Sequence, residues 1–223
     1  MQGPRWLPGA YTARLTSGTT VLTTPVAVVL DRRATFTLAD RQAQFDALEK
    51  VSDLFGRMTD LVAQINAVRL GADRRAAGLA DGDVLKAGLT DLSAKADSLR
   101  KEIVATKEGG AITGEERLRE FTDQLFGAIN AYEGAPAAYQ LTRIGVLNEQ
   151  LADISGRFDK LVAGDLAARN HDLADRKLAP IELPPGGGGT TGPGGGKPGA
   201  SLMGYRFELR PTSIAAPEET ERD

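Results

Sequence analysis

Apolar and polar residues alternate over residues 11–16, which is the pattern of a half-buried β-strand. One face carries Tyr11, Ala13 and Leu15, and the other carries Thr12, Arg14 and Thr16. Ser17-Gly18 follows as a turn, because glycine tolerates the positive φ of a tight hairpin. A second strand is predicted over residues 21–30, where Pro25 indicates a sheet edge or a bulge. We therefore expect the chain to begin with a β-hairpin, which is marginally stable alone.

The apolar period changes from two to three or four at residue 37, which predicts amphipathic helices. The first helix is expected from about Leu38 to Leu70, with Thr37 as its N-cap and Asp40 in its first turn. Gly71 and the glycines between 78 and 82 are expected to end it. Its apolar stripe consists of Phe45, Leu48, Phe55, Met58, Val62, Ile65 and Val68.

Three further apolar stripes follow the first. The second covers residues 85–103, and its helix is expected to end at Gly109-Gly110. The third covers residues 118–132, and Thr113-Gly-Glu-Glu116 fits a capping box at its start. The fourth runs from Pro136 to about Arg176. Four such helices with short connections predict an antiparallel bundle.

Glycines interrupt these predicted helices at five places, namely Gly56, Gly127, Gly145, Gly156 and Gly164. Each costs about 1 kcal/mol relative to alanine in a helix interior. Either helices approach closely at these positions or the long fourth helix bends, and the sequence leaves both alternatives open.

The composition changes abruptly after Pro180, where PPGGGGTTGPGGGKPG predicts a flexible linker. Beyond it, Tyr205, Phe207 and Leu209 alternate with charged residues, which predicts one short strand. The expected fold class is mainly α: a four-helix antiparallel bundle, preceded by a β-hairpin and followed by a Gly/Pro linker with one strand. The expected regions are a hairpin (1–36), a helical bundle (37–180), a flexible linker (181–200), a short strand (201–211) and a disordered tail (212–223).

Charge and composition narrow the function. The 223 residues include 27 Lys and Arg against 30 Asp and Glu, a formal net charge of -3, which lacks the basic excess expected of a nucleic-acid-binding protein. Cysteine is absent, so disulfides and thiolate chemistry are excluded. No apolar run approaches the roughly 20 residues that span a bilayer, and no signal peptide precedes the hairpin. We expect a soluble chain; its compartment, and whether Met1 is the biological start, stay open.

No catalytic, cofactor-binding or metal-binding residues are predicted. The Gly-rich stretch before Lys197 lacks the glycine and the Ser or Thr of a phosphate-binding loop. Asp81-Gly82-Asp83 lacks further oxygen ligands at calcium-loop spacing, so Asp83 is interpreted as a helix N-cap. His171 is the only histidine, which excludes a multi-histidine metal site, and it is interpreted as a solvated residue near a helix end. The remaining helical carboxylates are interpreted as solvated, and those at 115–116 as capping residues.

Two tyrosines and a glutamate surround a Gly-Ala-Pro turn after the third helix, namely Tyr132, Glu133 and Tyr139. In one interpretation the tyrosines cover the bundle end and Glu133 bonds to turn amides. In the other they form a partner surface, because amphipathic aromatic residues suit interfaces. Together with Tyr205 and Phe207 of the last strand, they are the candidate interaction residues.

Five segments occur in a recognisable order: WLPGAYTARLTSGTTVLTTPVAVVLDRR, QAQFDALEKV, ITGEERLREFTDQLFGAINAYEGAPAAYQLTRIGVLNEQL, DLAARNHDL and LAPIELPP. In this order the chain resembles the C-terminal region of bacterial sortilin-like glycosyl hydrolases with BNR/Asp-box repeats. The resemblance implies that the hairpin ends an Ig-like β-sandwich and that any chemistry belongs to an N-terminal β-propeller. The Asp-box pattern Ser-x-Asp-x-Gly-x-Thr-Trp is absent from this chain, so no functional residue of the family is carried over.

The leading hypothesis is a non-catalytic structural or interaction module that packs against or orients a β-propeller, or binds a partner protein. One alternative is a part of a glycosyl hydrolase that contributes carboxylates to an active site across a domain boundary. Another is a free-standing interaction scaffold whose C-terminal strand adds to the hairpin edge, in the same or another copy. No cofactor, nucleic acid or membrane span is expected, oligomerisation through exposed strands stays open, and the resemblance implies a family that is often exported.

Overall fold

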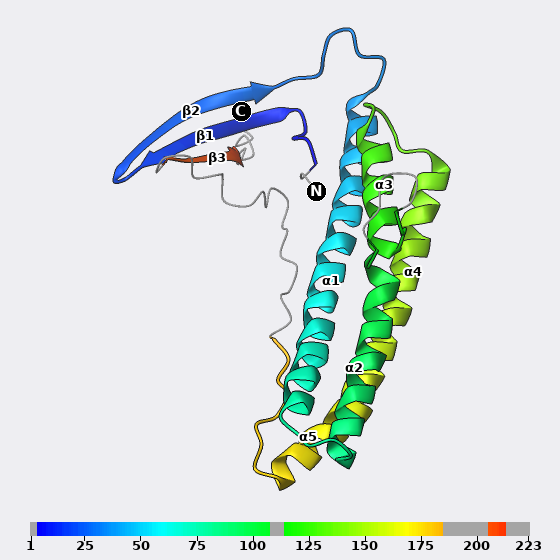
Figure 1. Ribbon diagram of the computed structural model, residues 1–223. Coiled ribbons are helices and arrows are strands. Elements are labelled where there is room, and N and C mark those ends of the chain that lie inside the picture. The colour runs from blue at the N-terminus through cyan, green and yellow to red at the C-terminus, as the bar shows by residue number, and fades with distance from the viewer. Residues whose placement is uncertain (1–3, 108–113, 185–204, 213–223) are drawn as a thin grey trace, which may run out of the picture.

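The computed structural model describes residues 4–107, 114–184 and 205–212 (Figure 1). Within these residues the chain is mainly helical, with four helices between an N-terminal antiparallel hairpin and a short strand near the C-terminus. The predicted fold class is confirmed in these features. The Gly/Pro sequence from 185, the chain after 212 and the predicted stop at Gly109-Gly110 lie outside the described residues.

The hairpin pairs β1, Gly9–Ser17, with β2, Thr20–Val28, in antiparallel orientation. Gly18 opens its two-residue loop with φ +56°, and a positive φ at this position is the requirement of a type II′ turn. The third strand, β3, Tyr205–Pro211, pairs antiparallel with the opposite edge of β1. The strand order is therefore β2-β1-β3, and Pro25 lies in an edge strand, as its missing N–H predicts.

The apolar face of the sheet is covered near the start of β1 and open near the turn. Tyr11 and Ala13 are buried. The Tyr11 ring meets the Trp6 ring edge to face, with centroids 5.2 Å apart, and its hydroxyl donates to the Leu7 carbonyl at 2.6 Å. Leu22 lies on the same face beside the turn and is 61% exposed. The segment before β1 thus shields one end of this face.

The first helix, α1, Leu38–Ala77, begins where the sequence predicts. The Thr37 hydroxyl accepts from the Asp40 N–H at 3.1 Å, and the Asp40 carboxylate accepts from the Thr37 N–H at 2.8 Å. The predicted end near Leu70 is wrong, because the helix continues through Gly71 to a cap at Gly78. Its 40 residues give a length of about 60 Å.

The next helices are α2, Val84–Ile103, α3, Leu118–Asn130, and α4, Ala138–Leu161. Asp83 caps α2 as predicted, accepting from the Leu85 N–H at 2.8 Å. The predicted helix start at 113–116 is wrong for the described residues 114–116, which are not helical, and Thr113 lies outside the description. Instead, the Glu120 carboxylate accepts from the Arg117 N–H at 3.0 Å, so α3 begins one turn later.

The four helices form three rods that lie side by side, because α2 and α3 lie end to end along α1 (Figure 1). α2 packs on the second half of α1, where Asp97 approaches Arg69. α3 packs on the first half, where Gln44 bonds to the Ile129 carbonyl. Both run antiparallel to α1, whereas α4 runs in the same direction as α1. Helices that follow one another in the chain are therefore antiparallel, except for α2 and α3, which run in the same direction.

The long fourth helix bends at its C-terminal end. After α4 the chain forms a π-helical turn, η1, Val162–Leu166, and continues as α5, Ala167–Asp175; Figure 1 shows α5 turning across the end of the bundle. π-helical turns are a recognised cause of kinks. A side chain added at any of the five predicted glycine interruptions would meet nothing within 4 Å. The fourth helix therefore bends at Gly164, which lies in the π-helical turn. None of the five glycines marks a close approach between helices.

The helices enclose one continuous apolar core. Its most buried large members come from every rod: Leu48 and Ile65 from α1, Leu89 from α2, Ile129 from α3, and Leu147 and Phe158 from α4. Among the residues that the structure describes, no member of this core belongs to the sheet. The bundle is therefore a self-contained packing unit.

The segment after α5 returns along α1 and packs on it. Ile181 is 4% exposed, and its N–H and carbonyl bond to the Asn170 side-chain amide at 2.8 and 3.1 Å. A Cβ on Gly71 would lie 2.7 Å from Ile181 Cγ2, and Arg75 Nε donates to the Ala179 carbonyl at 2.7 Å. The packed region therefore extends past residue 180, the boundary suggested by composition. Gly71 makes room for this crossing instead of ending the helix.

Candidate functional site

Three of the five candidate interaction residues come together at one end of the bundle. This surface, called here the bundle end, consists of Leu38 at the start of α1, Tyr132 and Glu133 in the α3–α4 turn, and Tyr139 and Leu141 in the first turn of α4. Gly134 in this turn has φ +154°, a backbone conformation that favours glycine. The turn therefore brings Tyr132 and Tyr139 to the same end of the molecule.

A buried glutamine fixes the base of this turn. The Gln44 side chain is 1% exposed. Its Nε2 donates to the carbonyl of Ile129 at 2.6 Å and also to the carbonyl of Tyr132, while its Oε1 accepts from Arg41. The last carbonyls of a helix lack partners within the helix, so Gln44 satisfies groups that the end of α3 leaves free. Sequence reasoning missed this residue, since a glutamine on an otherwise apolar stripe carries no distinct signal.

Glu133 joins the bundle end to the segment before β1. Its Oε1 lies 3.0 Å from Arg5 Nη1, and the two side chains are 40% and 54% exposed. The expectation that Glu133 bonds to turn amides gives way to this ion pair. An exposed pair contributes about 0–1 kcal/mol, so it orients the N-terminal segment more than it stabilises the fold.

The bundle end exposes aromatic and aliphatic side chains. Tyr139 is 69% exposed, Leu38 55%, Leu141 48% and Tyr132 44%. The Tyr132 hydroxyl lies 3.3 Å from both the Ala135 carbonyl and Gln140 Oε1, so its ring is held in place while its face stays accessible. Rigid aromatic side chains of this kind are frequent in protein interfaces.

The other two candidate residues lie elsewhere. Tyr205 and Phe207 belong to β3 and hold the register positions opposite Ser17 and Leu15 of β1. They are part of the sheet and do not extend the bundle end; their side chains lie outside the description. The candidate residues therefore divide between two separate surfaces.

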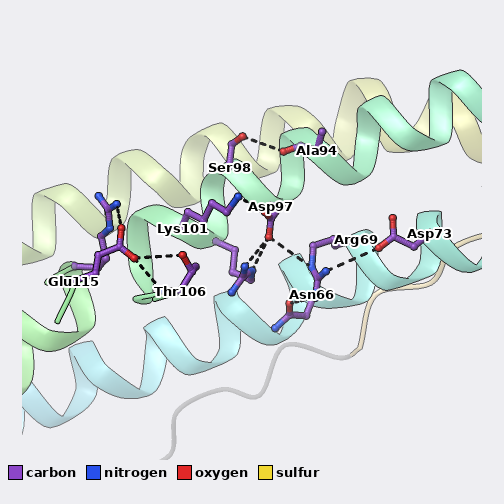
Figure 2. Close-up of polar contacts among 11 residues, drawn as sticks. Asn66, Arg69, Asp73, Ala94, Asp97, Ser98, Lys101, Thr106 and Glu115 are labelled. Carbon is purple, nitrogen blue, oxygen red and sulfur yellow. Dashed lines mark hydrogen bonds and ion pairs between the residues drawn. The ribbon is translucent and has the colours of Figure 1, made fainter. Parts of the chain in front are cut away.

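The charged residues between α1 and α2 form a structural network, which Figure 2 shows. The Asp97 carboxylate accepts from Arg100 at 2.7 Å and Lys101 at 2.8 Å, and Arg69 Nε of α1 lies 3.9 Å away. Hydrogen bonds from Lys101 and Arg100 hold the pKa of Asp97 below its usual value. A carboxylate surrounded by cations is stabilised as the anion, which suits an ion pair between helices and not a proton donor.

Glu115 closes the connection between α2 and α3. Its carboxylate accepts from the Thr106 N–H at 2.9 Å and from the Thr106 hydroxyl at 3.3 Å (Figure 2), and it also pairs with Arg117. The Thr106 N–H and the Arg117 guanidinium lower the pKa of Glu115 to about 2. The interpretation of this residue as part of a capping box is wrong, because its partner lies nine positions earlier in the chain.

A groove of about 1010 Å³ runs between α1 and α4. Charged side chains of both signs line it, including Lys50, Asp53, Arg57 and Asp159, and Arg57 bonds across it to Asn148. With Asp60, the lining has three carboxylates and two cations, and no convergent set of polar groups surrounds a buried centre. Such a groove lacks the features by which binding pockets for small molecules are usually recognised.

The single histidine is a surface residue. His171 is 78% exposed beside Asp175, as expected of a solvated histidine. In residues 4–107, 114–184 and 205–212, no group of three or more His, Asp or Glu side chains is arranged to hold a metal ion. No helix in this part of the chain is long and apolar enough to span a membrane.

No protein-family model, no curated protein and no solved structure matches this chain.

Proposed function

We propose that this chain is a non-catalytic structural and interaction module that holds a partner protein at the bundle end. The observation that carries the proposal is the exposure of aromatic and aliphatic side chains at one end of a long bundle, with Tyr139 at 69% and Leu38 at 55%. None of these side chains belongs to the bundle core. Tyrosine is one of the residues enriched among the side chains that dominate binding at protein interfaces.

The resemblance to sortilin-like glycosyl hydrolases supplies the partner class. In a protein of that kind, the partner would be a β-propeller, and the bundle would set its orientation relative to the sheet. The Arg5–Glu133 pair supports this role, because it ties the strand-bearing segment to the bundle end at 3.0 Å. Any hydrolysis would belong to the propeller, and none to this chain.

The test is direct binding of the purified chain to a β-propeller domain with Asp-box repeats, measured by calorimetry. The double variant Tyr132→Ala/Tyr139→Ala should weaken binding at least tenfold, because truncating an interface hot spot costs about 2 kcal/mol or more. Val146→Ala, at a residue of α4 that is 36% exposed, is the matched control and should bind as the unmodified chain does. Equal binding by all three proteins would place the interface elsewhere.

The catalytic alternative is tested separately. The chain is assayed against glycoside and peptide substrates, and turnover that disappears on substituting a single carboxylate would refute the non-catalytic assignment.

A second candidate function is supported by the pairing of β3 with β1. The hypothesis of a free-standing scaffold required the C-terminal strand to add to the hairpin edge, and β3 does so over Tyr11–Ser17. Strand addition of this kind is a general mode of peptide recognition.

A further inference from the structure

A row of polar side chains on α1 lines the groove between α1 and α4. This row, called here the α1 seam, consists of Lys50, Asp53, Arg57, Asp60 and Gln64. Its members are alternately three and four positions apart, so they lie along one side of the helix. The same spacing recurs where two long helices pair side by side. The first three members are exposed and Asp60 is half-buried, so the seam is accessible from outside the bundle.

The charges of the α1 seam form a pattern that is complementary to itself. Their signs alternate from Lys50 to Asp60, and reading them from the other end gives the same order with every sign reversed. Lys50 and Asp60 lie five positions on either side of residue 55, and Asp53 and Arg57 lie two positions on either side of it. The seam therefore has a centre of charge complementarity at residue 55.

This centre specifies how two copies of α1 can meet. When a second α1 lies antiparallel to the first with both residues 55 at the same level, Lys50 faces Asp60 of the other copy. Asp53 then faces Arg57 of the other copy, and two-fold symmetry repeats each pair. A parallel pair of helices would place every charge opposite its own equivalent, which is repulsive. The charge pattern thus favours the antiparallel arrangement.

The α4 side of the groove is compatible with the same arrangement. α4 runs in the same direction as α1 (Figure 1), and the bond from Arg57 to Asn148 shows which levels of the two helices coincide. A two-fold axis that crosses both helices therefore brings α4 against α4 of the second copy. Gly145, Ala152 and Gly156 line this side, and a Cβ on either glycine would meet nothing within 4 Å. Small side chains here leave room for the second copy.

We propose that the groove face of α1 and α4 is the interface of an antiparallel homodimer centred near residue 55. The occupant is a second copy of this chain because the α1 seam is complementary to its own sequence. The groove floor is already buried, as Leu54 and Leu61 show, so association buries little new apolar area and the dimer should be weak.

This dimer goes beyond the proposed function and leaves the bundle end free. Leu38 at the start of α1 marks the bundle end, and the antiparallel arrangement directs the two bundle ends in opposite directions. At 1.5 Å per residue, the two copies of Leu38 would lie about 50 Å apart. The dimer would therefore present two partner-binding surfaces at opposite ends of one rod.

The experiment uses the full chain and two charge-reversal variants, Lys50→Asp and Asp60→Lys. Sedimentation equilibrium at protein concentrations up to about 1 mM detects weak association. The unmodified chain should show a monomer–dimer equilibrium that weakens with added salt, because salt screens exposed ion pairs. Each variant alone places like charges opposite each other and should dimerise at least tenfold more weakly.

Mixing the two variants separates direct pairing from damage to the fold. An equimolar mixture of Lys50→Asp and Asp60→Lys restores opposite charges at both contacts, so it should form heterodimers as tight as the unmodified dimer. The double variant Lys50→Asp/Asp60→Lys should recover dimerisation for the same reason. Lys160→Asp is the matched control, because Lys160 is an exposed residue of α4 that is not part of the groove lining. It should dimerise as the unmodified chain does.

A second pair of variants covers the case in which Lys50→Asp or Asp60→Lys does not fold, as judged by circular dichroism. Asp53→Lys and Arg57→Asp reverse the inner pair of charges, and their equimolar mixture should likewise associate at least tenfold more tightly than either variant alone.

Three results would overturn the proposal. They are an unmodified chain that stays monomeric at all concentrations, a mixture that associates no better than its separate components, and loss of the dimer in Tyr132→Ala/Tyr139→Ala, which would place the contact at the bundle end. A monomeric chain would leave the bundle-end proposal standing, and absence of binding to a β-propeller would leave the dimer standing.

Discussion

The bundle and the sheet are stabilised in different ways. The bundle has a continuous core in which Ile65, Val68, Leu89 and Leu147 have no exposed area. The sheet buries only Tyr11 and Ala13 among its described hydrophobic residues, and Leu22 remains 61% exposed. Because burial of apolar area is the main favourable term in folding, the bundle folds on its own core, while the sheet depends on pairing and on the Trp6–Tyr11 contact.

The two regions also differ in how far apart their contacts lie in the sequence. The helices form hydrogen bonds between residues four positions apart, whereas β3 must find β1 from about 195 positions away. Closing so long a loop has an entropic cost. We therefore expect the sheet to open more readily than the bundle, which has a continuous apolar core. The following variants test this difference.

The largest effect is expected from truncating the bundle core. Phe158→Ala, at a residue 1% exposed, should lower the free energy of unfolding by about 3–5 kcal/mol, measured by urea denaturation. Leu22→Ala is the matched truncation in the sheet and should change it by less than about 0.5 kcal/mol. If Leu22→Ala proved as damaging as Phe158→Ala, the sheet would be part of the cooperative core.

The returning segment after α5 should behave as part of the bundle. Ile181→Ala should cost about 2 kcal/mol, the lower end for a buried isoleucine, because the segment can partly readjust. Gly71→Ala should be neutral or destabilising in the unmodified chain, since its Cβ would crowd Ile181. In the Ile181→Ala background it should instead stabilise α1 by up to about 1 kcal/mol. Additive effects in this double-mutant cycle would show that the two residues do not meet in solution.

Acidic pH should destabilise the connection between α2 and α3, which the Glu115–Thr106 hydrogen bonds hold in place. The pKa of Glu115 is about 2, below its usual 4.5, so its contribution to stability is present above pH 4.5 and is lost as the pH falls from 4.5 to 2. Glu115→Gln should therefore lower stability at neutral pH and flatten its pH dependence in this window, as followed by thermal unfolding.

Glu49 serves as a control because its pKa is shifted in the opposite direction from that of Glu115. Burial, with the nearby charges of Asp53 and Asp46, raises the pKa of Glu49, so its ionised form opposes folding at neutral pH. Glu49→Gln should raise stability at neutral pH. A loss of stability for Glu49→Gln would contradict this assignment.

The smallest effect is expected where the two regions meet. Arg5→Ala removes the ion pair with Glu133 and should lower the free energy of unfolding by less than about 1 kcal/mol, because the pair is exposed. It should nevertheless loosen the orientation of the sheet. Spin labels on β2 and α1 would report a broader distance distribution in the variant, and an unchanged distribution would show that other contacts hold the sheet.

Local patterns predicted the elements well. The change of period at residue 37 and the Thr37–Asp40 pair located the start of α1 to the residue, because an N-cap depends only on neighbours within one turn. The Asp83 cap and the turn at Gly18 followed from equally local rules, although Ser17 belongs to β1 and the loop consists of Gly18 and Thr19. The start of α3 was misplaced because Glu120 accepts from the Arg117 N–H and caps the helix one turn later, while Glu116 of the predicted capping box accepts from the Gln124 side chain. A local motif cannot reveal a competing partner.

The candidate site was predicted only in part. The sequence identified Tyr132 and Tyr139 as amphipathic residues at a turn, and they lie together at the bundle end. It did not separate them from Tyr205 and Phe207, which belong to the sheet, nor did it indicate the role of Gln44 or the Arg5–Glu133 pair. Their significance depends on partners 85 to 128 positions away.

Periodicity, turn residues and composition were enough to predict the existence of the helices, the hairpin and the late strand, and to exclude cysteine chemistry. Three features came from the tertiary structure alone: α2 and α3 share one rod, Gly71 makes room for Ile181, and β3 pairs with β1 on the side opposite β2. The physical reason is that such contacts depend on shape and register between distant segments. Hydrophobic patterns specify which faces are buried, but not which surface covers them.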